Sequence, residues 1–176
     1  MPRRSARGFR DQWIQFLRGS VLVSPANTFT QTTLALPTVV SQGLVLEMLD
    51  VEFAFESLAG SEISQTDDSL TIQVQLTKAS KTAMLVLSDP DLLAAYEVNF
   101  QSPSARTAEK APVIEINPMG SLYRAFPAPI LLPFEQIYLG ARTAGIATGP
   151  TLRVKIGYLT TRLATNQLVE LIQAIT

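Results

Sequence analysis

The chain has 176 residues, of which 47% are apolar and only 16% are charged, with a formal net charge of −1. These values are typical of one folded domain and exclude an intrinsically disordered chain. Histidine and cysteine are both absent, which excludes Ser-His-Asp and Cys-His catalysis, disulfides and the usual zinc and haem ligands. The acidic residues that remain form no general acid/base pair by position. We therefore expect no enzyme activity, no cofactor and no metal site.

Positive charge is concentrated at the N-terminus. The first 20 residues contain five arginines and one acidic residue, whereas the rest contain nine Lys or Arg and fourteen Asp or Glu. A run of arginines is suited to phosphate binding because each guanidinium presents a planar fork of donors. The candidate nucleic-acid-binding residues are Arg3, Arg4, Arg7 and Arg10.

The end of this basic arm shows helical periodicity. Phe9, Trp13, Phe16 and Leu17 follow one another at i, i+4, i+7 and i+8, which predicts a short amphipathic helix over residues 9–18. We expect these four side chains to form a subunit interface. Binding to an anionic membrane surface and capping of the chain's own domain are the alternatives.

Alternating apolar and polar residues dominate the rest of the chain. The clearest runs, 69–77 and 151–158, predict half-buried strands. Residues 50–56 also alternate, but 44–48 do so with the opposite parity, which predicts one long strand with a bulge near Met48 and Leu49. Shorter strands are expected at 21–24, 28–36, 83–88, 96–101, 113–117, 122–126 and 136–141.

Prolines and polar residues mark the remaining segments. Pro127, Pro129 and Pro133 indicate either an edge strand or a rigid loop. A short helix is expected over 89–95, where Asp89 would cap the first turn. A second helix is expected after Thr165 or Asn166, because four apolar residues recur there at helical spacing. These four residues are Leu168, Leu171, Ile172 and Ile175.

Two groups of residues have the composition of a binding site without its spacing. Asp67, Asp68, Asp89 and Asp91 are explained by turns and helix capping, with calcium coordination as the alternative. The glycine-rich segment 140–149 lacks the lysine of a phosphate-binding loop. We interpret it as a hairpin loop.

Many short strands joined by connections of unequal length predict an all-β fold. We expect a single eight-stranded antiparallel jelly-roll sandwich with a short N-terminal amphipathic helix and a short C-terminal helix. The expected organisation is an arm and helix at 1–19, the jelly-roll domain at 20–164, and the C-terminal helix at 165–176.

The whole chain resembles the single jelly-roll capsid (coat) proteins of small icosahedral viruses, especially those of metagenome type. The likeness is most particular in residues 129–133, 136–140 and 153–158. It implies a structural protein of the virion that self-assembles in many copies into an icosahedral shell enclosing the genome. It also implies that Arg3, Arg4, Arg7 and Arg10 face the viral nucleic acid.

Two alternatives remain open. In the coat of a membrane-containing phage, the N-terminal helix would contact lipid instead of nucleic acid. A cellular jelly-roll module would form a small oligomer and bind a ligand through loop residues such as Asp67, Asp68 or Arg142. The size of the assembly distinguishes a shell from such a module.

Overall fold

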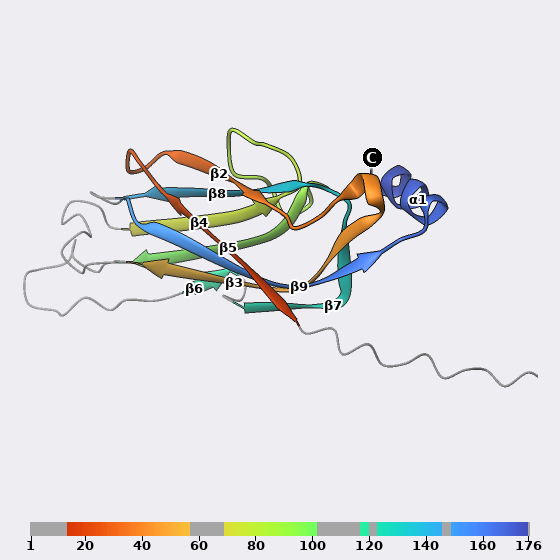
Figure 1. Cartoon of the computed structure of the whole chain (residues 1–176). Coiled ribbons are helices and arrows are strands. Elements are labelled where there is room, and N and C mark those ends of the chain that lie inside the picture. The colour runs from red at the N-terminus through yellow and green to blue at the C-terminus, as the bar shows by residue number, and fades with distance from the viewer. Residues whose placement is uncertain (1–13, 57–68, 102–116, 120–122, 146–148, 176) are drawn as a thin grey trace, which may run out of the picture.

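The computed structural model describes residues 14–56, 69–101, 117–119, 123–145 and 149–175 (Figure 1). They form nine strands, one 3-10 turn and one α-helix. In chain order these are β1 (Gln15–Leu22), β2 (Phe29–Ala35), η1 (Val40–Gln42), β3 (Leu44–Glu56), β4 (Ser69–Thr77), β5 (Leu92–Gln101), β6 (Asn117–Met119), β7 (Tyr123–Leu132), β8 (Gln136–Ala144), β9 (Thr151–Arg162) and α1 (Thr165–Ile175).

The strands form two antiparallel sheets that face each other. The first sheet has the order β1-β9-β3-β7, and the second has the order β2-β8-β4-β5-β6. Consecutive strands from β1 to β4 alternate between the two sheets, so the chain crosses repeatedly from one layer to the other (Figure 1). The predicted all-β sandwich is therefore confirmed.

Apolar side chains from the inner faces of both sheets form one core. In β4, the alternating residues Ile72, Val74 and Leu76 are all buried, as predicted from their spacing. The second sheet also contributes Ile137 and Leu139, and the first sheet contributes Val51, Phe53, Leu152, Val154 and Ile156.

The long strand β3 contains the predicted bulge. Its register shifts between Met48 and Asp50 against both of its neighbours, β7 and β9. Beside the bulge, the backbone N–H of Gly157 donates a hydrogen bond of 3.2 Å to the carboxylate of Asp50. The extra residue explains why the apolar positions of β3 change parity in the middle of the strand.

The predicted N-terminal helix is wrong for residues 15–18, which belong to strand β1; residues 9–13 lie outside the described part of the chain. Leu17 and Val21 point toward the core, whereas Phe16 and Arg18 point outward. All eight residues of β1 pair with β9. This pairing stabilises the strand more than a short isolated helix would be stabilised by its own apolar face, although the apolar residues have helical spacing. The sandwich therefore includes residues from Gln15 onward rather than from residue 20.

Two predictions near residue 90 are also wrong. Residues 83–88 form a loop instead of a strand, and residues 92–95 belong to β5 instead of a helix. The carboxylate of Asp89 does cap locally, since it accepts the N–H of Asp91 at 2.9 Å, but only one turn forms. From Leu92 onward, the chain pairs with β4 as strand β5.

Three local predictions remain, for the proline-containing segment, the C-terminal helix and the strand at 113–117. Pro127 and Pro129 lie in β7, at the edge of the first sheet, where a missing N–H breaks few sheet hydrogen bonds. The C-terminal helix is confirmed as α1. Its start is stabilised by Gln167, whose side-chain oxygen accepts the backbone N–H of Ala164 at 3.2 Å. The predicted strand at 113–117 lies outside the described residues except for Asn117, the first residue of β6.

Tyr96 links the core to the pH dependence of stability. Its side chain is buried in β5, 5.8 Å from the ring of Phe55, and burial raises the pKa of its hydroxyl above the usual value of 10.0. The stabilisation from the neutral phenol is thus complete below pH 10 and is lost as the pH rises toward the raised pKa. We expect the free energy of unfolding, measured in urea, to fall less steeply between pH 9 and 11 in Tyr96→Phe than in the wild type. Equal slopes would contradict the prediction.

Candidate functional site

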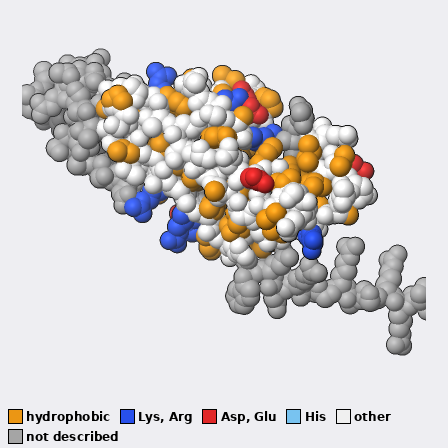
Figure 2. All heavy atoms as spheres, turned by 45° about the horizontal axis from the view of Figure 1, so that its top comes forward, with side chains coloured by type: hydrophobic (Ala, Val, Ile, Leu, Met, Phe, Trp, Pro, Cys, Tyr) orange, Lys and Arg blue, Asp and Glu red, His pale blue; other side chains and the backbone are white. Residues whose placement is uncertain are grey.

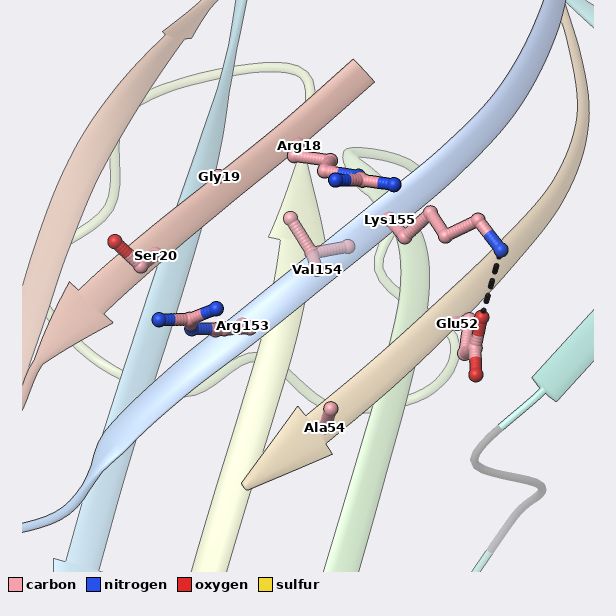
Figure 3. A pocket seen from close by; sticks show the side chains of 8 residues that line it. All are labelled: Arg18, Gly19, Ser20, Glu52, Ala54, Arg153, Val154 and Lys155. Carbon is pink, nitrogen blue, oxygen red and sulfur yellow. Dashed lines mark hydrogen bonds and ion pairs between the residues drawn. The ribbon is translucent and has the colours of Figure 1, made fainter. Parts of the chain in front are cut away.

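A shallow pocket of about 400 Å³ lies on the outer face of the first sheet (Figure 3). Three neighbouring strands line it. β1 contributes Arg18, Gly19 and Ser20, β3 contributes Glu52 and Ala54, and β9 contributes Arg153, Val154 and Lys155.

Strand register brings the polar residues of the pocket together. Arg18 on β1 is opposite Lys155 on β9, and Lys155 is opposite Glu52 on β3. One step along, Arg153 lies between Ser20 and Ala54. Directly opposed side chains on one face of a sheet lie about 5 Å apart. The short side chains beside Arg153 leave the hollow that its guanidinium borders.

The pocket carries a net positive charge. Its lining contains three cations and one carboxylate. The Nζ of Lys155 lies 3.3 Å from Oε2 of Glu52 and 4.6 Å from the centre of the Phe16 ring. Since Glu52 and Lys155 are both partly exposed, their ion pair is weak and leaves the lysine accessible. The side chains of Arg18 and Arg153 are exposed to solvent. This arrangement can bind an anion but contains no nucleophile with an adjacent base.

Most of the residues predicted for function lie outside the described part of the chain. These are Arg3, Arg4, Arg7, Arg10, Phe9 and Trp13. The other two, Phe16 and Leu17, lie on opposite faces of β1. Phe16 is 52% exposed, whereas Leu17 packs against the core. They therefore do not share one face, as the predicted helix required.

The cationic cluster of Arg18, Arg153 and Lys155 was not among the predicted sites. The alternation of residues 151–158 already placed Arg153 and Lys155 on one face of a strand. Nothing in the sequence pattern indicates that β1 is the neighbour of that strand. The sequence does show two cations at i and i+2 on one strand. They indicate a site only once the strand order is known, because the third cation, Arg18, comes from the neighbouring strand.

A loop covers part of the outer face of the second sheet. Residues 78–91 are held there by two glutamines of the sheet beneath them. Gln75 donates to the carbonyl of Ala83 at 3.1 Å and accepts the N–H of Leu85 at 2.7 Å. The side-chain oxygen of Gln31 accepts the hydroxyl of Ser80 and the N–H of Lys81. The loop exposes Val86 and Leu87 at its tip, where they are 70% and 75% exposed.

The candidate acidic residues of this loop have structural partners. Asp91 forms an ion pair with Lys81 at 2.6 Å, and the hydrogen bond that the Lys81 ammonium donates to this carboxylate raises the pKa of Lys81 above its usual value. Within the described ranges, no three acidic side chains group in a way that could hold a metal ion. Asp67 and Asp68 lie outside those ranges. Arg142 lies on β8, in the second sheet, and is exposed.

The helix α1 presents a third surface. It is attached to the first sheet at its start, where the N–H of Leu163 donates to the carbonyl of Gly43 at 2.9 Å, and it lies at one end of the sandwich (Figure 1). Val169 is 48% exposed and Ile172 is 40% exposed. Hydrophobic side chains also gather at this end of the molecule in the view of Figure 2. In the part of the chain that the structure describes, no helix has the length and apolar character to span a membrane.

Comparison with known proteins adds no assignment to these surfaces. No protein-family model matches the sequence, and no curated protein matches it.

Proposed function

We propose that this chain is the coat-protein subunit of a small icosahedral virus and assembles in many copies into a shell around a nucleic-acid genome. The order β1-β9-β3-β7 opposite β2-β8-β4-β5 supports a jelly roll, with β6 as an addition at the sheet edge. A jelly roll is shared by viral coats, lectins and cupins, so the fold alone does not decide between them. The choice depends on the surfaces.

The apolar face of α1 is the observation that carries the proposal. A helix of 11 residues is marginal by itself in water and is normally stabilised by packing. Here Val169 and Ile172 remain substantially exposed. Contact with a neighbouring subunit would remove this apolar surface from water, and repeated contacts of moderate size are how closed symmetric assemblies gain stability.

A further feature agrees with an assembling subunit. Exposed large apolar side chains also occur on β1 and just before it, on the loop 78–91 and on β7, in different parts of the surface. They are Ile14, Phe16, Leu22, Val86, Leu87 and Tyr123. A shell subunit has several neighbours and therefore needs several such surfaces, whereas a ligand-binding module needs one concave site.

The first test is the size of the particle formed by the full chain, measured by light scattering across a range of salt and pH, with the ratio of absorbance at 260 and 280 nm. We expect a shell-sized species that contains nucleic acid. A monomer or trimer under all conditions would contradict the proposal and favour the ligand-binding module.

A double substitution on α1 tests the interface directly. We expect Val169→Lys together with Ile172→Lys to prevent shell formation, because two charges would have to be buried against a neighbour. Circular dichroism should show that the sandwich remains folded, since both side chains are exposed in the isolated chain. Gln173→Lys, at an exposed polar position of the same helix, is the control and should still assemble. Assembly of the double variant at the wild-type level would rule out α1 as the contact.

A further inference from the structure

We propose that the outer face of β1, β9 and β3 is itself a binding surface for single-stranded nucleic acid, separate from the arginine arm. Phosphates would bind at Arg18, Arg153 and Lys155, and a base would stack on Phe16. This inference rests on the proposed function, because the packaged genome is the polyanion that a coat subunit would meet.

The spacing of the cations suits a chain of phosphates. Arg153 and Lys155 are two residues apart on β9, which places their Cα atoms about 6.6 Å from each other along the strand. Arg18 is on the neighbouring strand, opposite Lys155, about 5 Å across. The cations therefore occupy successive positions on an open surface instead of converging on one point. The guanidinium groups of Arg18 and Arg153 can each bind a phosphate through two N–H donors.

The position of Arg18 in the chain also favours a polymer over a small anion. Arg18 follows Arg10 by eight residues, and the chain enters β1 at Gln15. The arginines of the arm are thus close in sequence to the first cation of the sheet face. A polyanion bound by one of these two regions lies within reach of the other, which raises the effective concentration of its remaining phosphates.

Phe16 supplies a contact that is not electrostatic. Its ring is half exposed and lies next to the cluster, with Nζ of Lys155 4.6 Å from the ring centre (Figure 3 shows Lys155 and its neighbours). Cationic side chains beside an exposed aromatic ring are the combination that binds single strands, because every base has a face that can stack.

A membrane fits this face less well than a nucleic acid. Insertion into a lipid surface needs a continuous apolar face. The exposed apolar side chains of β1, Phe16 and Leu22, are separated by Arg18 and Ser20 on the same face of the strand. The charged positions therefore interrupt the apolar ones in the middle of the surface.

The test is binding of a fluorescent 20-nucleotide oligothymidylate to the full chain, followed by anisotropy from 50 to 300 mM KCl. The double variant Arg18→Gln, Arg153→Gln should weaken binding about tenfold or more at low salt and reduce the slope of log K against log[salt] by about 1.4, since each phosphate contact contributes about 0.7. Phe16→Ser should weaken binding about fivefold or more without changing that slope.

The matched control is the double variant Arg142→Gln, Arg162→Gln. It removes two exposed arginines, one from the second sheet and one from the far end of β9. We expect it to bind within about threefold of the wild type with nearly the same salt slope, because unspecific charge effects alone are small at these salt concentrations. Equal loss in both double variants would overturn the assignment to this face.

Three further measurements separate this inference from binding by the arm, from membrane binding and from the proposed function. A full-length variant with Arg3, Arg4, Arg7 and Arg10 all changed to Gln should still bind oligothymidylate, with the binding then abolished by Arg18→Gln and Arg153→Gln. Loss of all binding in the arm variant would overturn the inference while leaving the coat-protein proposal intact. The inference would be overturned in favour of a membrane if Arg18→Gln, Arg153→Gln abolished binding to phosphatidylserine vesicles but left oligothymidylate binding unchanged. If the chain forms no shell but binds oligothymidylate in a way that depends on Arg18 and Arg153, the result would support the inference and contradict the proposed function.

Discussion

Replacing Gln75 by leucine is expected to lower the free energy of unfolding by about 3 kcal/mol, because two backbone groups lose the hydrogen bonds that this side chain makes with them. Gln75 is fully buried beneath the loop 78–91. Its amide donates to the carbonyl of Ala83, and its oxygen accepts the N–H of Leu85. Leucine has a similar volume but can make neither of these two hydrogen bonds.

Hydrogen exchange distinguishes local opening of the loop from general destabilisation. If the loop opens to hydrate these groups, the amides of residues 78–91 should exchange much faster, while those of β4 and β8 stay protected. Gln73→Leu is the matched control, two residues away on the same face of β4. Gln73 is only partly buried and bonds to Glu97 at 2.7 Å, so water can replace its contact and we expect a loss under about 1 kcal/mol. Similar losses from both variants in urea unfolding would show that Gln75 does not hold the loop.

Replacing Gly149 by alanine should be at least as damaging, because a backbone atom occupies the space that the new methyl group needs. A Cβ at this position would lie 1.7 Å from the carbonyl oxygen of Val23. Val23 is buried, and its N–H donates to the carbonyl of Pro150 at 3.2 Å. Relief of the clash requires the two segments to separate and lose this hydrogen bond. We expect a loss of about 3 kcal/mol and a melting temperature lower by roughly 10 °C.

Gly19→Ala provides the comparison for this prediction. There the nearest atom to a new Cβ is the tip of the Leu34 side chain, at 2.3 Å. A side chain can rotate away from such a contact, whereas the carbonyl of Val23 moves only with its backbone. We expect Gly19→Ala to lower the melting temperature by less than half as much. A melting temperature of Gly149→Ala within 2 °C of the wild type would contradict the geometry of this contact.

The sequence pattern was sufficient to predict an element where the spacing of its own apolar residues shows which face is buried. The alternation of Ile72, Val74 and Leu76 located β4, and the change of parity around Met48 located the bulge of β3. The apolar spacing of Leu168 and Leu171 located α1. In each case the residues within one element carry the information, because the period of 2 or 3.6 is a local property.

Prediction failed where the outcome depends on a distant partner. Residues 15–18 satisfy a helical pattern, but β9 offers them backbone hydrogen bonds along an entire strand. Residues 83–88 have strand-like composition, but the Gln75 side chain fixes them as a loop. The cationic cluster has the same origin, since Arg18 meets Lys155 only through the pairing of the first and last described strands. Such contacts depend on tertiary structure and leave no local pattern.

The position of β9 in the first sheet affects how the chain can fold during its synthesis. Both β1 and β3 pair with β9, and β7 joins this sheet only through β3. Among the described strands, only β4 and β5 pair with their immediate successors in the chain, which are β5 and β6. A nascent chain can therefore form these hairpins early, whereas β1 has no strand partner until residues 151–158 emerge from the ribosome. Folding dominated by such long-range pairing is slow, and the apolar inner faces of β1 and β3 are exposed to chaperones or to other nascent copies until the last strand arrives.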